Sequence, residues 1–112
     1  MPFHLILENN QSKADMLIAK FRLEKSDYCV SRSVIRAKQI VDTLCKEPFS
    51  FILYVDYELD PGCGFGTEFL DYMIAKYPSH IFSVVVTTMS REIAGRMLKQ
   101  CSAALIPATQ YC

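Results

Sequence analysis

An acidic side chain directly follows an apolar run in the middle of the chain. The run comprises residues 51–55 (FILYV), and Asp56 stands at its end. A run that is apolar on both faces is typical of a buried, parallel strand. In open α/β sheets, ligands bind outside the carboxyl ends of the strands, which is where Asp56 is expected to lie. A carboxylate at that place could act as a nucleophile, as a general base or as a metal ligand.

Two more predicted strands also end in polar residues. The polar residues at the three strand ends are Glu8, Asn9 and Asn10; Asp56, Glu58 and Asp60; and Thr87, Thr88 and Ser90. The carboxyl ends of parallel strands share one edge of a sheet, so these side chains converge if the three strands are neighbours. Their oxygen atoms suit Mg²⁺, which takes one or two carboxylates together with water and phosphate. The metal candidates are Glu8, Asp56 and Glu58.

Helix capping is the simpler explanation for some of these polar residues, because Ser, Thr, Asn and Asp are preferred N-caps. The pattern predicts N-caps at Ser12, Ser33 and Ser90, and a helix that opens at Thr67. Asp56 differs from them, because a charge that follows five apolar residues needs a partner or a task.

The hydrophobic pattern predicts strands that alternate with helices. The predicted strands are residues 3–7, 27–31, 50–55, 81–86 and 103–106, and amphipathic stripes predict a helix after each of the first four. The second helix is expected to end at Pro48, and Gly95 inside the fourth indicates close packing. This alternation predicts an α/β fold with a parallel sheet covered on both faces. Residues 1–112 are expected to form one free-standing domain.

Composition excludes several classes of protein. Twelve basic and twelve acidic residues balance, which does not favour nucleic acid or an anionic membrane as the partner. No apolar run is long enough to span a membrane, and the N-terminus does not resemble a signal peptide, so we expect a cytoplasmic protein. Five cysteines without a close pair predict reduced thiols. Lys13, Lys20, Arg22 and Lys25 are expected to form the basic outer side of the first helix, as a solvated face; the alternative is a patch that binds RNA or a partner.

Three segments resemble the receiver domain, the phosphoacceptor module of two-component signalling. They are LILENNQSKADMLIAKF, FILYVDYELDPGCGFGTEFLDYM and VVVTTMS. The resemblance implies a three-layer, flavodoxin-like domain with a five-stranded parallel sheet in the order 2-1-3-4-5. The final helix of the receiver domain is expected to be missing from this chain. It matches Asp56 to the phosphoacceptor, Glu8 to a Mg²⁺-binding acid and Thr87 to the switch hydroxyl. Asn9 stands where receivers have a second acid, and no lysine follows the last predicted strand, where receivers place one that pairs with phosphate.

The chain is also similar to a shorter variant of this domain, the cyclic-phosphate-processing receiver-like family. Residues 56–59 (DYEL) and 87–90 (TTMS), followed by Arg96 and Met97, match its motifs in spacing. This resemblance implies action on cyclic phosphate ends of RNA or of nucleotides. The site residues it implies are Asp56, Tyr57 and Thr87 for catalysis and Asn9, Thr88 and Ser90 for binding. Tyr57 and Thr87 replace the two motif histidines of that family.

Three functions therefore stay open. The chain could be an enzyme, or a former enzyme, that binds Mg²⁺ and a phosphate-bearing ligand at Asp56. It could be a phosphoacceptor switch in which Asp56 becomes an aspartyl phosphate. It could also be a catalytically inactive pseudo-receiver that binds a partner protein and needs none of this chemistry.

Overall fold

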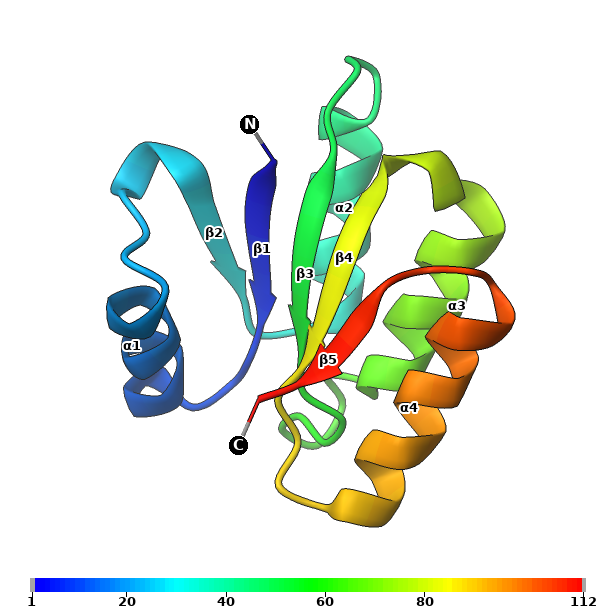
Figure 1. The fold of residues 1–112 in the computed structure, drawn as a ribbon. Coiled ribbons are helices and arrows are strands. Elements are labelled where there is room, and N and C mark those ends of the chain that lie inside the picture. The colour runs from blue at the N-terminus through cyan, green and yellow to red at the C-terminus, as the bar shows by residue number, and fades with distance from the viewer. Residues whose placement is uncertain (1, 112) are drawn as a thin grey trace.

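The computed structural model describes residues 2–111, in which strands and helices alternate along the chain (Figure 1). The strands are β1 (Phe3–Leu7), β2 (Tyr28–Ser31), β3 (Phe51–Val55), β4 (Ile81–Val86) and β5 (Ala108–Gln110). The α-helices are α1 (Gln11–Lys20), α2 (Val34–Leu44), α3 (Gly66–Lys76) and α4 (Arg91–Ala103). Two short 3₁₀ helices, η1 (Lys25–Asp27) and η2 (Pro78–His80), precede β2 and β4.

The five strands form one parallel sheet in the order β2-β1-β3-β4-β5. This confirms the predicted α/β class and the predicted flavodoxin-like strand order. Leu7 is in register with Val55, and Val55 is in register with Val86. The last residues of β1, β3 and β4 are therefore side by side, so the residues that follow them begin at the same level of the sheet.

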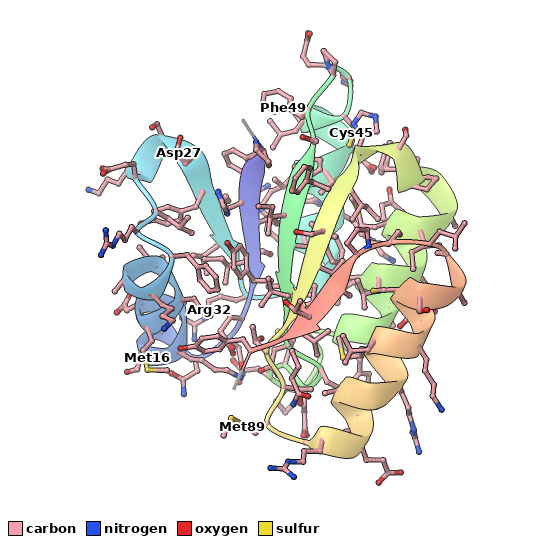
Figure 2. All side chains as sticks on the ribbon, viewed as in Figure 1. Met16, Asp27, Arg32, Cys45, Phe49 and Met89 are labelled. Carbon is pink, nitrogen blue, oxygen red and sulfur yellow. The ribbon has the colours of Figure 1, made fainter. Side chains whose placement is uncertain are left out.

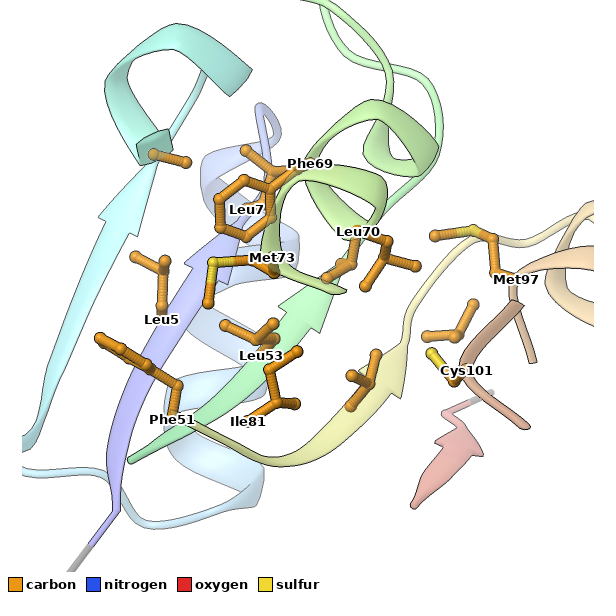
Figure 3. Packing of buried hydrophobic residues seen from close by; sticks show 14 of the residues in the cluster. Leu5, Leu7, Phe51, Leu53, Phe69, Leu70, Met73, Ile81, Met97 and Cys101 are labelled. Atoms are coloured by element: carbon orange, nitrogen blue, oxygen red, sulfur yellow. The ribbon is translucent and has the colours of Figure 1, made fainter. Parts of the chain in front are cut away.

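Three helices cover one face of the sheet and α1 covers the other (Figure 1). The alternation of side chains along β3 explains this division, because successive residues of a strand point to opposite faces. Phe51, Leu53 and Val55 pack in the larger core with residues of α2, α3 and α4, including Met73 and Met97 (Figure 3). The smaller core, on the side of α1, contains Ile6, Ala14, Leu17, Tyr54 and Val85.

The predicted fifth strand was placed wrongly. Residues up to Ala103 belong to α4, and a turn follows in which Leu105 has a φ of 59°. Its backbone N–H bonds to Ser102, and that of Ile106 bonds to Cys101, so residues 103–106 end the helix. The strand is the polar segment Ala108–Gln110, paired with Val84–Val86 of β4. The segment after Pro107, in which no strand was predicted, thus forms the edge of the sheet; Cys112 lies outside the described residues.

Two of the predicted helix starts were wrong and two are confirmed. Asn10 rather than Ser12 caps α1, since its side chain accepts a hydrogen bond from the backbone N–H of Lys13 at 3.1 Å. The helix α3 begins at Gly66 after Phe65, so Thr67 lies inside its first turn. The N-caps of the other two helices are as predicted: Ser33 caps α2 and Ser90 caps α4.

Two smaller expectations were also wrong. The helix α2 ends at Leu44, and a turn connects it to Pro48. A Cβ atom on Gly95 would have no neighbour within 4 Å, so this glycine does not mark close packing. Among residues 2–111, no helix combines the length and the apolar character that crossing a membrane requires.

Candidate functional site

The polar residues after β1, β3 and β4 continue the ladder of the sheet. The backbone N–H of Asp56 bonds to the carbonyl of Leu7 at 3.2 Å, and that of Thr87 bonds to the carbonyl of Val55 at 3.0 Å. Side chains of successive residues in a strand point to opposite faces of the sheet. Since Leu7, Val55 and Val86 face the larger core, the next residues, Glu8, Asp56 and Thr87, point to the face that α1 covers. The predicted convergence of these three strand ends is therefore present, and α1 is the helix that flanks it.

Glu8 is the most deeply buried acid of this site. The residue is 2% exposed, and its Oε2 accepts hydrogen bonds from the backbone N–H groups of Asn9 at 3.1 Å and Asn10 at 3.3 Å. Its Oε1 accepts no hydrogen bond from any of residues 2–111. The Asp56 side chain is 14% exposed, and its Oδ1 accepts a hydrogen bond from the backbone N–H of Tyr57 at 2.8 Å. Each carboxylate thus has one oxygen held by backbone and one that faces other charges.

Lys13 supplies the positive charge between the two acids. Its Nζ lies 3.3 Å from Glu8 Oε1 and 3.6 Å from Asp56 Oδ2, and its side chain is 20% exposed. The expectation that Lys13 belongs to the solvated outer side of the first helix was therefore wrong. The spacing contained a signal, because a residue three positions after the Asn10 cap lies in the first turn of α1, beside the end of β1.

The environment of Glu8 opposes its ionisation. Burial raises the pKa of this carboxyl above 4.5, and the neighbouring charge of Asp56 raises it further. The ammonium of Lys13 and the backbone N–H of Asn10 act in the opposite direction, but the net pKa shift is upward. Glu8 is the group of this site that is best placed to hold a proton.

The hydroxyl groups after β4 have different surroundings. Thr87 is 1% exposed, and its Oγ1 has no hydrogen-bond partner within residues 2–111. Thr88 Oγ1 accepts a hydrogen bond from the backbone N–H of Ser90 at 3.4 Å, and Ser90 Oγ accepts one from Ile93 at 3.3 Å. Thr88 and Ser90 are therefore engaged in the turn and the helix cap, and Thr87 keeps an uncommitted hydroxyl beside Asp56.

The remaining candidates lie around the rim of the site. Asn9 donates from Nδ2 to Asp60 Oδ1 at 2.8 Å, and its carbonyl accepts a hydrogen bond from Arg32 at 2.7 Å. Tyr57 is half-buried and its ring packs on Phe65, with 5.1 Å between the centroids. Glu58 is exposed, and within residues 2–111 its carboxylate bonds to no other side chain. The structure thus brings Glu8, Asp56 and Thr87 together and leaves Glu58 outside.

These residues do not fit Mg²⁺ as they are arranged. Mg²⁺ requires oxygen ligands at about 2.0–2.1 Å in octahedral geometry. The oxygens that would serve, Glu8 Oε1 and Asp56 Oδ2, are those that the ammonium of Lys13 approaches. No three His, Cys, Asp or Glu side chains within residues 2–111 are grouped in a way that could hold a metal ion. A divalent ion at this place would require Lys13 to leave.

Comparison with known proteins shows the fold alone. No protein family and no curated protein matches the sequence. Among solved structures, the chain is similar to the crystal structure of the "signal receiver domain of putative Luxo repressor protein from Vibrio parahaemolyticus". The TM-score is 0.70 at 17% sequence identity, and the match covers 97% of this chain and 77% of the other. The chain therefore has the fold of a signal receiver domain.

Proposed function

We propose that the chain is a diverged receiver-like regulatory module that acts by binding a partner protein through the two ends of α4. The observation that carries this proposal is Leu105, which is 92% exposed and has a φ of 59°. The left-handed conformation is unfavourable for a residue with a Cβ atom by about 1–2 kcal/mol, and glycine is the usual residue after a helix end. A leucine at this position therefore lowers the stability of the chain, and its side chain gains no burial within the chain that would offset the loss. Contact with a partner would bury it.

A second exposed apolar side chain lies at the other end of α4, near the carboxyl ends of the strands. Met89 is 81% exposed and projects from the loop between β4 and α4 (Figure 2). Its neighbours in that loop are Thr88 and Ser90, whose hydroxyls are already engaged in the turn and the cap. A partner that contacts Met89 would lie next to the loop that carries Thr87. Single exposed apolar residues are common on protein surfaces, so Leu105 carries the proposal and Met89 extends it.

The experiment separates binding from stability. Tagged wild type and Leu105→Gly are used to capture proteins from an extract of the source cells. Leu105→Gly is expected to be at least as stable as the wild type and to lose the captured partner by tenfold or more. Arg22→Gly is the matched control, because Arg22 has the same left-handed conformation after α1, with a φ of 54°. Equal capture by Leu105→Gly and Arg22→Gly would refute the proposal.

A phosphate-bearing ligand at Asp56 is the second candidate function. The observation that favours it is the Thr87 hydroxyl, which is buried next in register to Asp56 and has no hydrogen-bond partner among the described residues. Such a hydroxyl is free to bond to a phosphate oxygen, and the ammonium of Lys13 could pair with the phosphate charge. In this function Asp56 and Tyr57 would act on a cyclic phosphate, or Asp56 would accept a phosphoryl group.

Two assays test this second candidate. Incubation with a small phosphodonor, with and without Mg²⁺, would give a phosphoryl mass increase that is absent in Asp56→Asn. Hydrolysis of a 2′,3′-cyclic nucleotide that is lost in Asp56→Ala and weakened in Thr87→Val would support the enzyme. If neither reaction occurs under conditions that succeed with a known receiver and a known hydrolase, the second candidate is refuted.

We place this module in the cytoplasm. Its cysteines at positions 29, 45, 63 and 101 are free thiols. Burial raises the pKa of the Cys101 thiol to about 11, which keeps it protonated and unreactive. Unpaired thiols are typical of a reducing compartment.

A further inference from the structure

Lys13 is held in place by the start of its helix. Its backbone N–H donates to the Asn10 side chain, which fixes the first turn of α1. From this turn the side chain reaches Glu8 and Asp56 and is itself only 20% exposed. A lysine loses rotamer freedom when it is ordered in this way, so the attraction between the charges must offset that loss.

The two acids need a positive charge beside them. Glu8 Oε1 is buried without a hydrogen bond in the described part of the chain, and the neighbouring charge of Asp56 repels a charge on Glu8. Asn9, the residue after Glu8, is neutral and donates from its amide group to Asp60 Oδ1 at 2.8 Å. The site therefore holds the carboxyl groups of Glu8 and Asp56, and a single ammonium, that of Lys13, lies beside both.

We propose that the Lys13 ammonium is the resident cation of this site, in place of a divalent metal, and that the strand-end acids are neutralised without Mg²⁺. Ammonium and Mg²⁺ cannot both occupy the space between Glu8 Oε1 and Asp56 Oδ2, because both need the same oxygen lone pairs. This inference goes beyond the proposed function. It concerns the charge at the strand ends and holds whether or not a partner binds at α4.

The test is a titration with Mn²⁺, followed by its electron paramagnetic resonance signal, on the wild type and on Lys13→Met. Methionine keeps the length of the side chain and removes its charge. Lys13→Met is expected to bind one Mn²⁺ at least about tenfold more tightly than the wild type, because a competing charge has been removed. Mg²⁺ is expected to raise the melting temperature of Lys13→Met and to leave that of the wild type unchanged. Lys20→Met, on the exposed last turn of the same helix, is the matched control and is expected to behave as the wild type.

Two results would overturn the inference. One is equal affinity of Lys13→Met and the wild type for Mn²⁺. The other, which does not depend on the folding of Lys13→Met, is Mn²⁺ bound by the wild type and released in Asp56→Asn. Because partner capture is measured separately with Leu105→Gly, failure of the inference is distinguishable from failure of the proposed function.

Discussion

The α-carbon of Gly66 packs directly against the backbone carbonyl of Asp56, so closely that a Cβ atom at Gly66 would overlap it. The backbone N–H of Gly66 also bonds to the carbonyl of Tyr57 at 2.7 Å. The start of α3 and the end of β3 are thereby fixed together through backbone atoms. The position of Asp56 thus depends on a glycine ten residues further along the chain.

Gly66→Ala is expected to destabilise the protein by about 2–3 kcal/mol, because the added methyl group forces the backbone at Asp56 to move. Urea unfolding followed by circular dichroism measures the change. Gly95→Ala is the control, since its Cβ atom would meet nothing within 4 Å inside α4. That substitution is expected to stabilise the protein by about 1 kcal/mol. Equal effects of the two substitutions would show that the contact at Asp56 is unimportant.

Glu8→Gln is expected to stabilise the protein at neutral pH. The folded state raises the pKa of Glu8 from 4.5, mainly through burial, so the folded chain binds this proton more tightly than the unfolded chain does. The wild type is therefore destabilised as the pH rises through the pKa of folded Glu8, and glutamine avoids this loss. The advantage of the variant should disappear as the pH falls toward 4.5. Urea unfolding over a pH series tests this, and a variant that is less stable at neutral pH would show that pairing with Lys13 outweighs burial.

Leu105→Gly is expected to raise the free energy of unfolding by about 1 kcal/mol, because glycine adopts the left-handed conformation without steric strain. Arg22→Gly should give a similar gain at the end of α1. Thermal and urea unfolding measure both. Since Leu105 is 92% exposed, little packing is lost with its side chain. A clear loss of stability in Leu105→Gly alone would mean that this leucine has a structural role within the chain.

Tyr54→Phe is expected to lower the free energy of unfolding by about 1 kcal/mol, through loss of one buried hydrogen bond. The Tyr54 hydroxyl is hydrogen-bonded to His4 Nδ1 at 2.7 Å, and burial raises the pKa of Tyr54 to about 12. Tyr57→Phe is the control, because the Tyr57 hydroxyl has no hydrogen bond within residues 2–111. Burial lowers the pKa of His4 from 6.5, so the folded protein loses stability when acidic solutions protonate His4. Urea unfolding is therefore measured at a pH above 6.5. Equal stabilities of Tyr54→Phe and Tyr57→Phe would contradict the prediction.

The central elements could be predicted from the sequence because their patterns are strong. The runs at residues 51–55 and 81–86 are apolar on both faces and end in polar residues, and only a buried parallel strand satisfies both features. Helices with apolar stripes between such runs then specify the α/β class. The strand order required the resemblance to receiver domains, since alternation by itself leaves the order open.

The edge strand could not be predicted in the same way. Residues 108–110 (ATQ) have no apolar pattern, because an edge strand buries little of its surface. The strand was predicted at the more apolar segment 103–106, but this segment is the turn that ends α4, and Ile106 is buried in the larger core. At the start of α1, several residues near Ser12 could serve as caps, and only the backbone geometry selects Asn10.

The sequence pattern predicted two acids of this site, Asp56 and Glu8, but it did not predict the cation, Lys13. Asp56 and Glu8 were identifiable because a charge at the end of an apolar run is unusual. Lys13 was not, because a lysine on an amphipathic helix is normally solvated. The spacing places Lys13 in the first turn of α1, but its role also depends on the distance between α1 and β3, which belongs to the tertiary structure.

Among the described helices, α1 is the one that covers its face of the sheet, so α1 and the neighbouring edge strand β2 are expected to unfold locally. Within residues 2–111 the edge strand β2 pairs with β1 and with no other strand. The helix α1 reaches the sheet through a small cluster that includes Ala14 and Leu17. Amide hydrogens of α1 and β2 should therefore exchange with solvent deuterium faster than those of β3 and β4. Each opening of α1 would carry Lys13 away from Glu8 and Asp56. The frequency of that opening, rather than the shape of the folded surface, would then set how often the two acids become accessible.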